Sequence, residues 1–116
     1  MKKKEIVKNT WEFENIIKNG VCIKNRYYVI HYIDNDLKYS RYGISVSKKL
    51  GNAVVRNHYK RKIRSIIDSY KKECNHSKDY IIILRKDAID KEFKLLKQEF
   101  FHLMKEKGNY KNEAKK

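Results

Sequence analysis

The sequence predicts an α+β fold, an α/β sandwich in which three helices pack against a small central sheet of about four strands. Hydrophobic residues make up 41% of the 116 residues, which is enough for one buried core. Apolar residues recur at helical spacing in three segments and alternate or run together in others. The sequence contains no proline, no internal repeat and no composition shift that would separate domains. We therefore expect one domain over residues 1–116, with a flexible tail from about residue 108.

The N-terminal elements are predicted to be a helix followed by two strands. Asn9 is suited to cap the first helix, and Glu12 three residues later would complete a capping box. Gly20 follows the apolar stripe and is typical of a helix end. Val21–Ile23 reads as a short edge strand. Arg26–Asp34 is rich in aromatic and β-branched residues, which favour a strand.

The central part of the chain predicts a hairpin and then a crossover. Residues Tyr39–Val46 read as a strand, and the turn residues after Ile33 make it the hairpin partner of the strand before. A long helix opens at Gly51-Asn52 and runs to about Glu73. Tyr80–Leu84 is a continuous apolar run, as expected of a strand buried on both faces. A helix crossing between Val46 and Tyr80 could make the two strands that it joins parallel.

The last helix is predicted to begin at Asp90, which is suited to cap it. Phe93, Leu96, Phe100 and Leu103 form its apolar stripe. The predicted element order is therefore α-β-β-β-α-β-α.

The long central helix has two chemically different sides. At about 100° per residue, one arc carries the residues expected to face the core, namely Val55, Tyr59, Ile63, Ile66, Ile67 and Tyr70. The adjoining arc carries Arg56, Asn57, Lys60, Arg61 and Arg64. One side would anchor the fold, which leaves the other free to bind a partner.

The basic side of this helix belongs to a longer acid-free window. The formal net charge is +15, and between Asp36 and Asp68 there is no acidic residue but nine lysines and arginines. A charge run is usually a solvated face, but such a face normally mixes both signs. A one-sign window favours a polyanionic partner, with nucleic acid ahead of an anionic membrane surface. No apolar run approaches the roughly 18 residues of a membrane-spanning helix, and no secretion signal is present, so we expect a cytoplasmic protein.

The residues that could carry chemistry do not form a recognisable active site. The acidic residues are scattered toward the two ends of the chain, and the four histidines lack ligand spacing. No phosphate-binding loop, dinucleotide fingerprint or nucleophile elbow is present. We predict no catalytic and no metal-binding residue. Cys22 and Cys74 are expected to be two reduced, partly buried thiols rather than a disulfide.

The first long strand suggests a possible binding groove. By period-two alternation, Tyr27, Val29, His31 and Ile33 share one face of the sheet. A histidine on that face would be explained by a groove that stays open to solvent and offers surfaces for unpaired bases. The alternative is a partly buried histidine whose hydrogen bonds are satisfied within the protein.

One window of the sequence carries a family resemblance. From Gly43 to Arg64 it reads G-I-S-V-S-K-K-L-G-N-A-V-V-R-N-H-Y-K-R-K-I-R. This resembles the pattern G-I-S-V-S-K-K-x-G-N-A-V-x-R-N-R-x-K-R-x-x-R of the bacterial ribonuclease P protein component. Asn25-Arg26-Tyr27-Tyr28 and Asp79-Tyr80-Ile81-Ile82-Ile83 resemble two further segments of that family. The resemblance covers about residues 5 to 107.

The resemblance implies a function shared with an RNA. Proteins of this family pair with a large catalytic RNA in an endonuclease that removes the 5′ leader from precursor tRNA. The RNA and its Mg²⁺ ions carry out the hydrolysis, and the protein assists as a non-catalytic subunit, expected as a monomer in the complex. The fold would contain an uncommon left-handed crossover, against the usual right-handed preference.

The resemblance also implies two working surfaces. Contact with the catalytic RNA would come from Lys48, Lys49, Asn52, Arg56, Asn57, His58, Lys60, Arg61 and Arg64. The leader would lie in a cleft that includes Phe13, Ile17 and His31.

Three of these positions depart from the family pattern. His58 stands where a second arginine is usual, Ile17 where phenylalanine is frequent, and His31 where tyrosine is frequent. We expect one fixed charge fewer and weaker stacking on leader bases. The alternative function from another class is a general basic RNA-binding module, such as a ribosomal protein. A protein nuclease ranks third, because no carboxylate cluster is visible.

Overall fold

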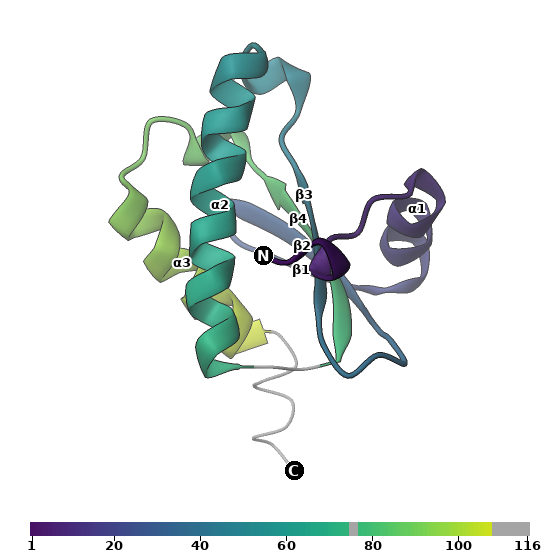
Figure 1. Cartoon of the computed structure of the whole chain (residues 1–116). Helices are drawn as coiled ribbons and strands as arrows, with labels where there is room; N and C mark the ends of the chain where they lie inside the picture. Colours follow the sequence, from purple (N-terminus) through teal and green to yellow (C-terminus); the bar gives the residue numbers. More distant parts are fainter. Residues whose placement is uncertain (75–76, 108–116) are drawn as a thin grey trace.

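The computed structural model describes residues 1–74 and 77–107, which form one four-stranded mixed sheet with helices on both faces (Figure 1). The strands are β1 (Val21–Lys24), β2 (Tyr28–Asp34), β3 (Arg41–Ser45) and β4 (Lys78–Leu84). The helices are α1 (Thr10–Asn19), α2 (Ala53–Glu73) and α3 (Phe93–Lys107). Short 3-10 helices, η1 to η3, cover Lys3–Glu5, Lys48–Leu50 and Lys86–Ala88. The predicted α+β class and element order are confirmed, and the tail from residue 108 lies outside the described residues.

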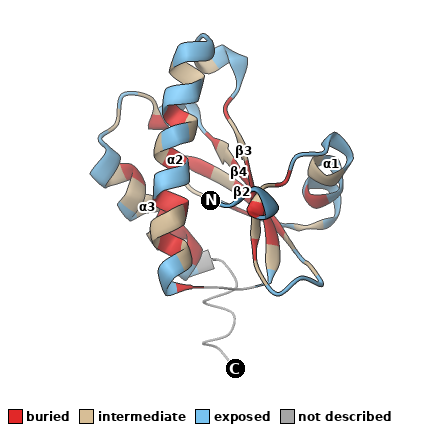
Figure 2. Ribbon diagram, in the orientation of Figure 1, coloured by how far each residue is buried: buried red, intermediate tan, exposed pale blue. Residues whose placement is uncertain are grey.

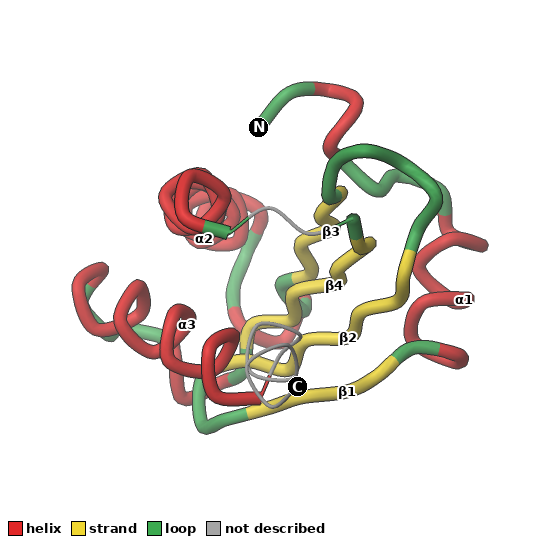
Figure 3. The backbone as a smooth tube through the Cα atoms, turned by 90° about the horizontal axis from the view of Figure 1, so that it is seen from below, coloured by secondary structure: helices red, strands yellow, loops and turns green. Residues whose placement is uncertain are grey.

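The helices cover the two faces of the sheet to different extents. Helices α2 and α3 cover one face, and α1 covers part of the other (Figures 1 and 3). The larger core lies under α2 and α3, where alternate residues of β2 and β4 such as Ile30 and Ile82 are fully buried. The smaller core lies under α1, around Ile16 and Ile81. Because Ile81 and Ile82 are both fully buried, β4 is the strand buried on both faces that the apolar run predicts.

The predicted hairpin between the second and third strands is wrong. The strand order is β1-β2-β4-β3, so β4 lies between β2 and β3. β2 pairs antiparallel with both β1 and β4, whereas β3 pairs parallel with β4. The turn after Asp34 does reverse the chain, but the central place goes to the strand with apolar residues on both sides, which is β4. Helix α2 makes the β3-to-β4 crossover, and comparing Figures 1 and 3 shows that it is left-handed.

Of two predicted helix starts, the one at Asn9 is confirmed and the one at Asp90 is wrong. Asn9 stands at the N-cap of α1, but its side chain makes no capping hydrogen bond, and Glu12 binds elsewhere. Asp90 is not the cap of α3, which begins at Phe93. Instead, Asp90 has a φ of 67° and its backbone N–H donates to the Tyr59 hydroxyl at 2.7 Å. Asp90 therefore shapes the loop that precedes α3, which suits a residue type that tolerates positive φ.

Gly20 ends α1, although not by the left-handed geometry typical of such glycines. Its φ is −88°, an ordinary value. A Cβ atom at this position would lie 2.4 Å from the Tyr32 carbonyl oxygen and 2.5 Å from that of Ile16. Since both neighbours are backbone atoms that cannot rotate away, the close passage of α1 and β2 requires glycine here.

The apolar arc of α2 faces the larger core as predicted, with Val55 only half-buried at its edge. Figure 2 shows the exposed residues gathered at the N-terminal end of this helix. Among the tyrosines that the structure describes, six are buried, and Tyr42 stacks on Tyr80 at 5.0 Å between ring centroids. Buried rings cannot stack on bases, so these six rings serve the core. Both cysteines are free thiols; Cys74 is buried, but Cys22 is exposed rather than partly buried.

Candidate nucleic-acid interface

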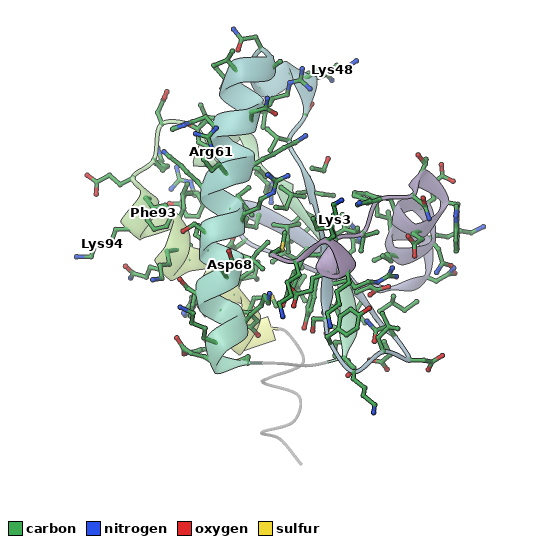
Figure 4. All side chains as sticks on the ribbon, viewed as in Figure 1. Lys3, Lys48, Arg61, Asp68, Phe93 and Lys94 are labelled. Atoms are coloured by element: carbon green, nitrogen blue, oxygen red, sulfur yellow. The ribbon has the colours of Figure 1, made fainter. Side chains whose placement is uncertain are left out.

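A basic surface, formed by η2 and the N-terminal half of α2, lies at one end of the molecule. Figure 4 shows Lys48 where α2 begins and Arg61 further along the helix. Two side chains fix this junction: Ser47 Oγ accepts from the backbone N–H of Lys49 at 3.2 Å, and Asn52 Oδ1 accepts from that of Val55 at 3.0 Å. Asn52 is therefore the N-cap of α2, and its side-chain oxygen stabilises the start of the helix. The lysines of η2 remain exposed beside the helix start.

The cations of this basic surface have no acidic partners. Between Lys48 and Arg64 there are seven, namely Lys48, Lys49, Arg56, Lys60, Arg61, Lys62 and Arg64. Throughout residues 1–74 and 77–107, none of these seven is ion-paired, and the Nε of Arg56 is buried without a hydrogen-bond partner. Cations elsewhere, such as Arg41, Lys71 and Lys105, do have carboxylate partners. An unneutralised group of this kind attracts polyanions and raises their association rate.

The structure separates His58 from the other residues predicted to bind RNA. Asn57, Arg61 and Arg64 are exposed on the side of α2 away from the core, with Arg56 and Lys60 half-buried beside them. His58 instead lines a hollow with Val54, Lys62 and the loop residues Asp90 to Glu92. Its ring stands edge-on to Tyr59 at 5.6 Å. Because two carboxylates, Asp90 and Glu92, offset two lysines, Lys62 and Lys91, in this hollow, it is a less favourable place for phosphate than the basic surface.

Two of the three residues predicted to form the leader cleft, Phe13 and His31, lie beside one buried side chain of β4. Phe13 packs against Ile81, and His31 is the register partner of Ile81 on β2. Ile17 lies one turn after Phe13 on α1 and is 44% exposed. All three are therefore on the α1 side of the sheet, where Phe13 and His31 are half-buried. This surface, which we call the α1 cleft, joins the basic surface: one hollow is lined by Phe13 and Ile44 together with Lys60 and Arg64 of α2.

Burial sets the protonation state of His31. Its Nδ1 is buried and lacks a hydrogen-bond partner among the described residues, and desolvation lowers the pKa of the imidazole below its ordinary value of 6.5. The alternative of a histidine satisfied within the protein therefore does not hold for this nitrogen. Burial thus favours the neutral ring, and because this nitrogen is itself buried, it is not open to an external ligand.

This protonation state makes stability depend on pH. A depressed pKa means that the unfolded chain binds a proton more readily, so the contribution of His31 is fully present above pH 6.5 and falls as the solution is acidified. We expect the unfolding free energy of wild type minus that of His31→Phe to decrease between pH 7 and pH 5. Urea denaturation at several pH values measures this difference, and a constant difference would contradict it.

Sequence reasoning missed a group of charged residues that holds α1 on the sheet. Arg41 of β3 donates from Nε to Asp79 Oδ1 at 2.9 Å and from Nη2 to Asp79 Oδ2 at 2.5 Å. The same Nη2 donates to Glu12 Oε2 of α1 at 2.9 Å. The hydrogen bonds to Asp79 raise the pKa of Arg41 against the opposing effect of burial, so the guanidinium stays charged. No local pattern reveals this Glu12–Arg41–Asp79 group, because its members are 29 and 38 residues apart.

The described residues offer no obvious place for a resident metal ion. Within residues 1–74 and 77–107, no three histidine, cysteine, aspartate or glutamate side chains come together as a ligand set. None of the described helices is long and apolar enough to cross a membrane. What the described surface does offer is a basic region, continuous with a half-apolar cleft, which suits a flexible polyanion with exposed bases.

Comparison with known proteins agrees with this chemistry. A family model described as Ribonuclease P matches residues 1–108. The chain is 45% identical over 107 residues to the ribonuclease P protein component of Mycoplasma mycoides subsp. mycoides SC, covering 91% of this chain and 98% of that one. It is similar to the RNase P protein structure from Staphylococcus aureus, with a TM-score of 0.80, 37% identity and coverage of 87% and 93%.

A more distant relative has the same fold. The RNase P protein from Thermotoga maritima superposes with a TM-score of 0.81 at 30% identity, covering 87% of this chain and 96% of that one. Sequence, fold and family model therefore agree over nearly the whole chain. The chain belongs to the ribonuclease P protein component family, whose members are parts of an endoribonuclease that works together with an RNA.

Proposed function

We propose that this chain is the protein subunit that assists a catalytic RNA in removing the 5′ leader of precursor tRNA. In this proposal the basic surface binds the catalytic RNA and the α1 cleft binds the single-stranded leader, in the cytoplasm and with one protein copy per complex. The observation that carries the proposal is the group of seven unpaired cations between Lys48 and Arg64. Such cations neutralise phosphates and release counterions, which supplies affinity without sequence preference.

The α1 cleft would add contacts that phosphate binding alone does not provide. Phe13 offers an aromatic edge, and the half-buried ring of His31 lies on the same side of the sheet. Lys60 and Arg64, which share a hollow with Phe13, would neutralise backbone phosphates where the leader approaches α2. The proposal thus makes one RNA-binding surface out of two regions that differ in chemistry.

We propose that the Mg²⁺ ions of the reaction are held by the catalytic RNA and the substrate. Mg²⁺ takes oxygen ligands, and RNA phosphates supply them. The ions would stabilise the charge that develops on the cleaved phosphodiester. The protein's own residues would bind and orient the substrate and screen the repulsion between two RNA chains.

Reconstitution tests the proposed function directly. Purified protein alone should leave precursor tRNA intact, yet it should accelerate cleavage by the catalytic RNA, most clearly at low Mg²⁺ concentration, where charge screening by the protein matters most. Gel analysis of the released leader measures both. Cleavage by metal-replete protein without RNA would refute the cofactor role. Binding without acceleration would favour a general RNA-binding module instead.

A salt titration tests the basic surface. Arg56→Ala or Arg61→Ala should each weaken binding to the catalytic RNA and reduce the slope of log affinity against log salt by about one unit, because one phosphate contact is lost. The matched control is Lys72→Ala, an exposed cation near the other end of α2. We expect the slope of this control to equal that of wild type, and an unchanged slope in the arginine variants would place RNA elsewhere.

A further inference from the structure

We propose that Arg41 is a positioning residue that sets the geometry of the α1 cleft by holding α1 on the sheet. The inference deepens the proposed function and rests on it, because it concerns the leader. Arg41 itself lies beneath α1, and its side chain is only 21% exposed. It therefore acts on an RNA through the helix that it binds.

Helix α1 is attached to β3 by two consecutive residues. Glu12 accepts the Arg41 Nη2 hydrogen bond at 2.9 Å, and Phe13 lies over Gly43, the next residue of β3 on the same face. A Cβ atom on Gly43 would come within 2.6 Å of Phe13 Cζ, so the ring rests directly on the strand backbone. The ion pair and the ring contact fix the position of one helical turn against alternate residues of one strand.

The helix has few other constraints. It is ten residues long, and isolated helices of that length are marginal in water. Asn9 adds no side-chain cap, and the only buried side chain of α1 is that of Ile16. Trp11 and Ile17 remain 67% and 44% exposed. The orientation of α1 therefore depends strongly on the ion pair between Glu12 and Arg41. The Glu12 side chain is 16% exposed, so solvent screens this ion pair little.

The strength of this contact comes from the way Arg41 is held. Asp79, with a side chain 9% exposed, receives two Arg41 nitrogens in a fork, and Asn35 Nδ2 donates to the same carboxylate at 2.8 Å. The fork fixes the guanidinium plane before Glu12 binds. Glu12 then meets a donor whose direction is already set, so α1 is held in angle as well as in distance.

Releasing Glu12 should therefore change one function and spare the other. Phe13 and Ile17 would lose their fixed position relative to His31, which weakens the α1 cleft. The basic surface lies on η2 and α2. Among the described residues, neither of these elements forms an ion pair with Glu12. Leader binding should fall, whereas affinity for the catalytic RNA should not.

The test uses the reconstituted complex and two substrates, precursor tRNA with a long leader and precursor tRNA with a one-nucleotide leader. Glu12→Gln should raise KM for the long-leader substrate about tenfold, the effect of replacing one charge-assisted hydrogen bond by a weaker neutral one, and leave kcat unchanged. KM for the short-leader substrate and the Kd for the catalytic RNA should match wild type. Glu14→Gln removes the same charge from an exposed site on the same helix and is the matched control.

A second variant separates positioning from mere stability. Arg41→Lys keeps the charge but cannot serve both carboxylates with a planar fork, so it should reproduce the leader-specific rise in KM. Its combination with Glu12→Gln should be no worse than the poorer single variant, since both act on one contact. An equal rise in KM for both substrates would overturn the inference, and so would a wild-type KM in a folded Glu12→Gln protein. If wild type itself ignores leader length, the proposed leader site fails instead.

Discussion

Replacing Asp79 with alanine is expected to lower the free energy of unfolding by about 3 kcal/mol, because breaking a buried ion pair leaves an uncompensated charge. Asp79 lies on β4 and is buried. It accepts two hydrogen bonds from Arg41 and one from Asn35. Without it, Arg41 retains only Glu12 to offset its desolvation. Urea denaturation followed by circular dichroism measures the loss as a lower midpoint at an unchanged slope.

The matched control for Asp79→Ala is Asp34→Ala. Asp34 also forms an ion pair across β2 and β4, with Lys78, but its side chain is 83% exposed. Exposed pairs contribute about 0–1 kcal/mol, so this variant should unfold close to wild type. Similar losses in the two variants would mean that burial does not determine the strength of the Arg41 contacts. Asp79→Asn should fall between the two, since it keeps the shape and part of the hydrogen bonding.

Replacing Phe100 with alanine is expected to cost about 3–5 kcal/mol, the range for a large side chain removed from a core. Phe100 of α3 is fully buried and touches one ring edge-on from each of two other elements, Tyr28 at 5.5 Å and Tyr70 at 5.7 Å between centroids. Those rings belong to β2 and α2, so Phe100 joins α3 to both. Its loss would remove these aromatic contacts and leave a cavity between three elements.

Phe93→Ala provides the comparison on the same helix. Phe93 begins α3 and is 37% exposed. The same substitution there should cost less than about 1 kcal/mol, because few buried contacts are lost. Thermal unfolding monitored by circular dichroism gives both values. A small effect of Phe100→Ala would show that α3 contributes little to the core, contrary to the burial of Leu96, Phe100 and Met104.

The periodicity of the sequence identifies the elements well because burial dictates it. The apolar arc of α2 contains Ile63, Ile66 and Ile67, which are all fully buried in the structure. The run at Tyr80–Leu84 is apolar throughout because β4 has a core on each side. Tertiary packing causes these patterns, but each one lies within a short stretch of sequence. They can therefore be recognised from one sequence alone.

Strand order and side-chain partners could not be predicted in the same way. The turn at Asp34 to Asp36 is a genuine reversal, yet β3 pairs with β4, which comes 33 residues or more later in the chain. Glu12 fits a capping box, but Arg41 offers it a charged partner in a half-buried site, which is stronger than a backbone N–H. Both errors arise because a distant residue competes with a neighbour for the same bond.

The candidate site was likewise predictable from the sequence only in part. From Lys48 to Arg64, the acid-free window identifies cations that the structure leaves unpaired, whereas Arg41 in the same window is ion-paired with Asp79 and Glu12. The contacts of the unpaired cations with RNA remain a prediction. The position of His58 could not be read from the motif. It faces a hollow beside Asp90 because the loop before α3 packs next to that side of α2. Helical periodicity gives the side of a helix, whereas the elements that cover each side depend on the tertiary fold.

The strand order also has a consequence for synthesis of the chain. β4 occupies an inner position of the sheet but is the last strand to leave the ribosome. Until it emerges, β1 and β2 can form only a two-stranded ribbon, which is marginally stable at best, and β3 lacks its main hydrogen-bonding partner. The highly basic segment from Lys48 to Arg64 is then already exposed without a completed domain behind it. Folding of the nascent chain must therefore wait for the second half, while its most strongly charged part is free to meet ribosomal RNA.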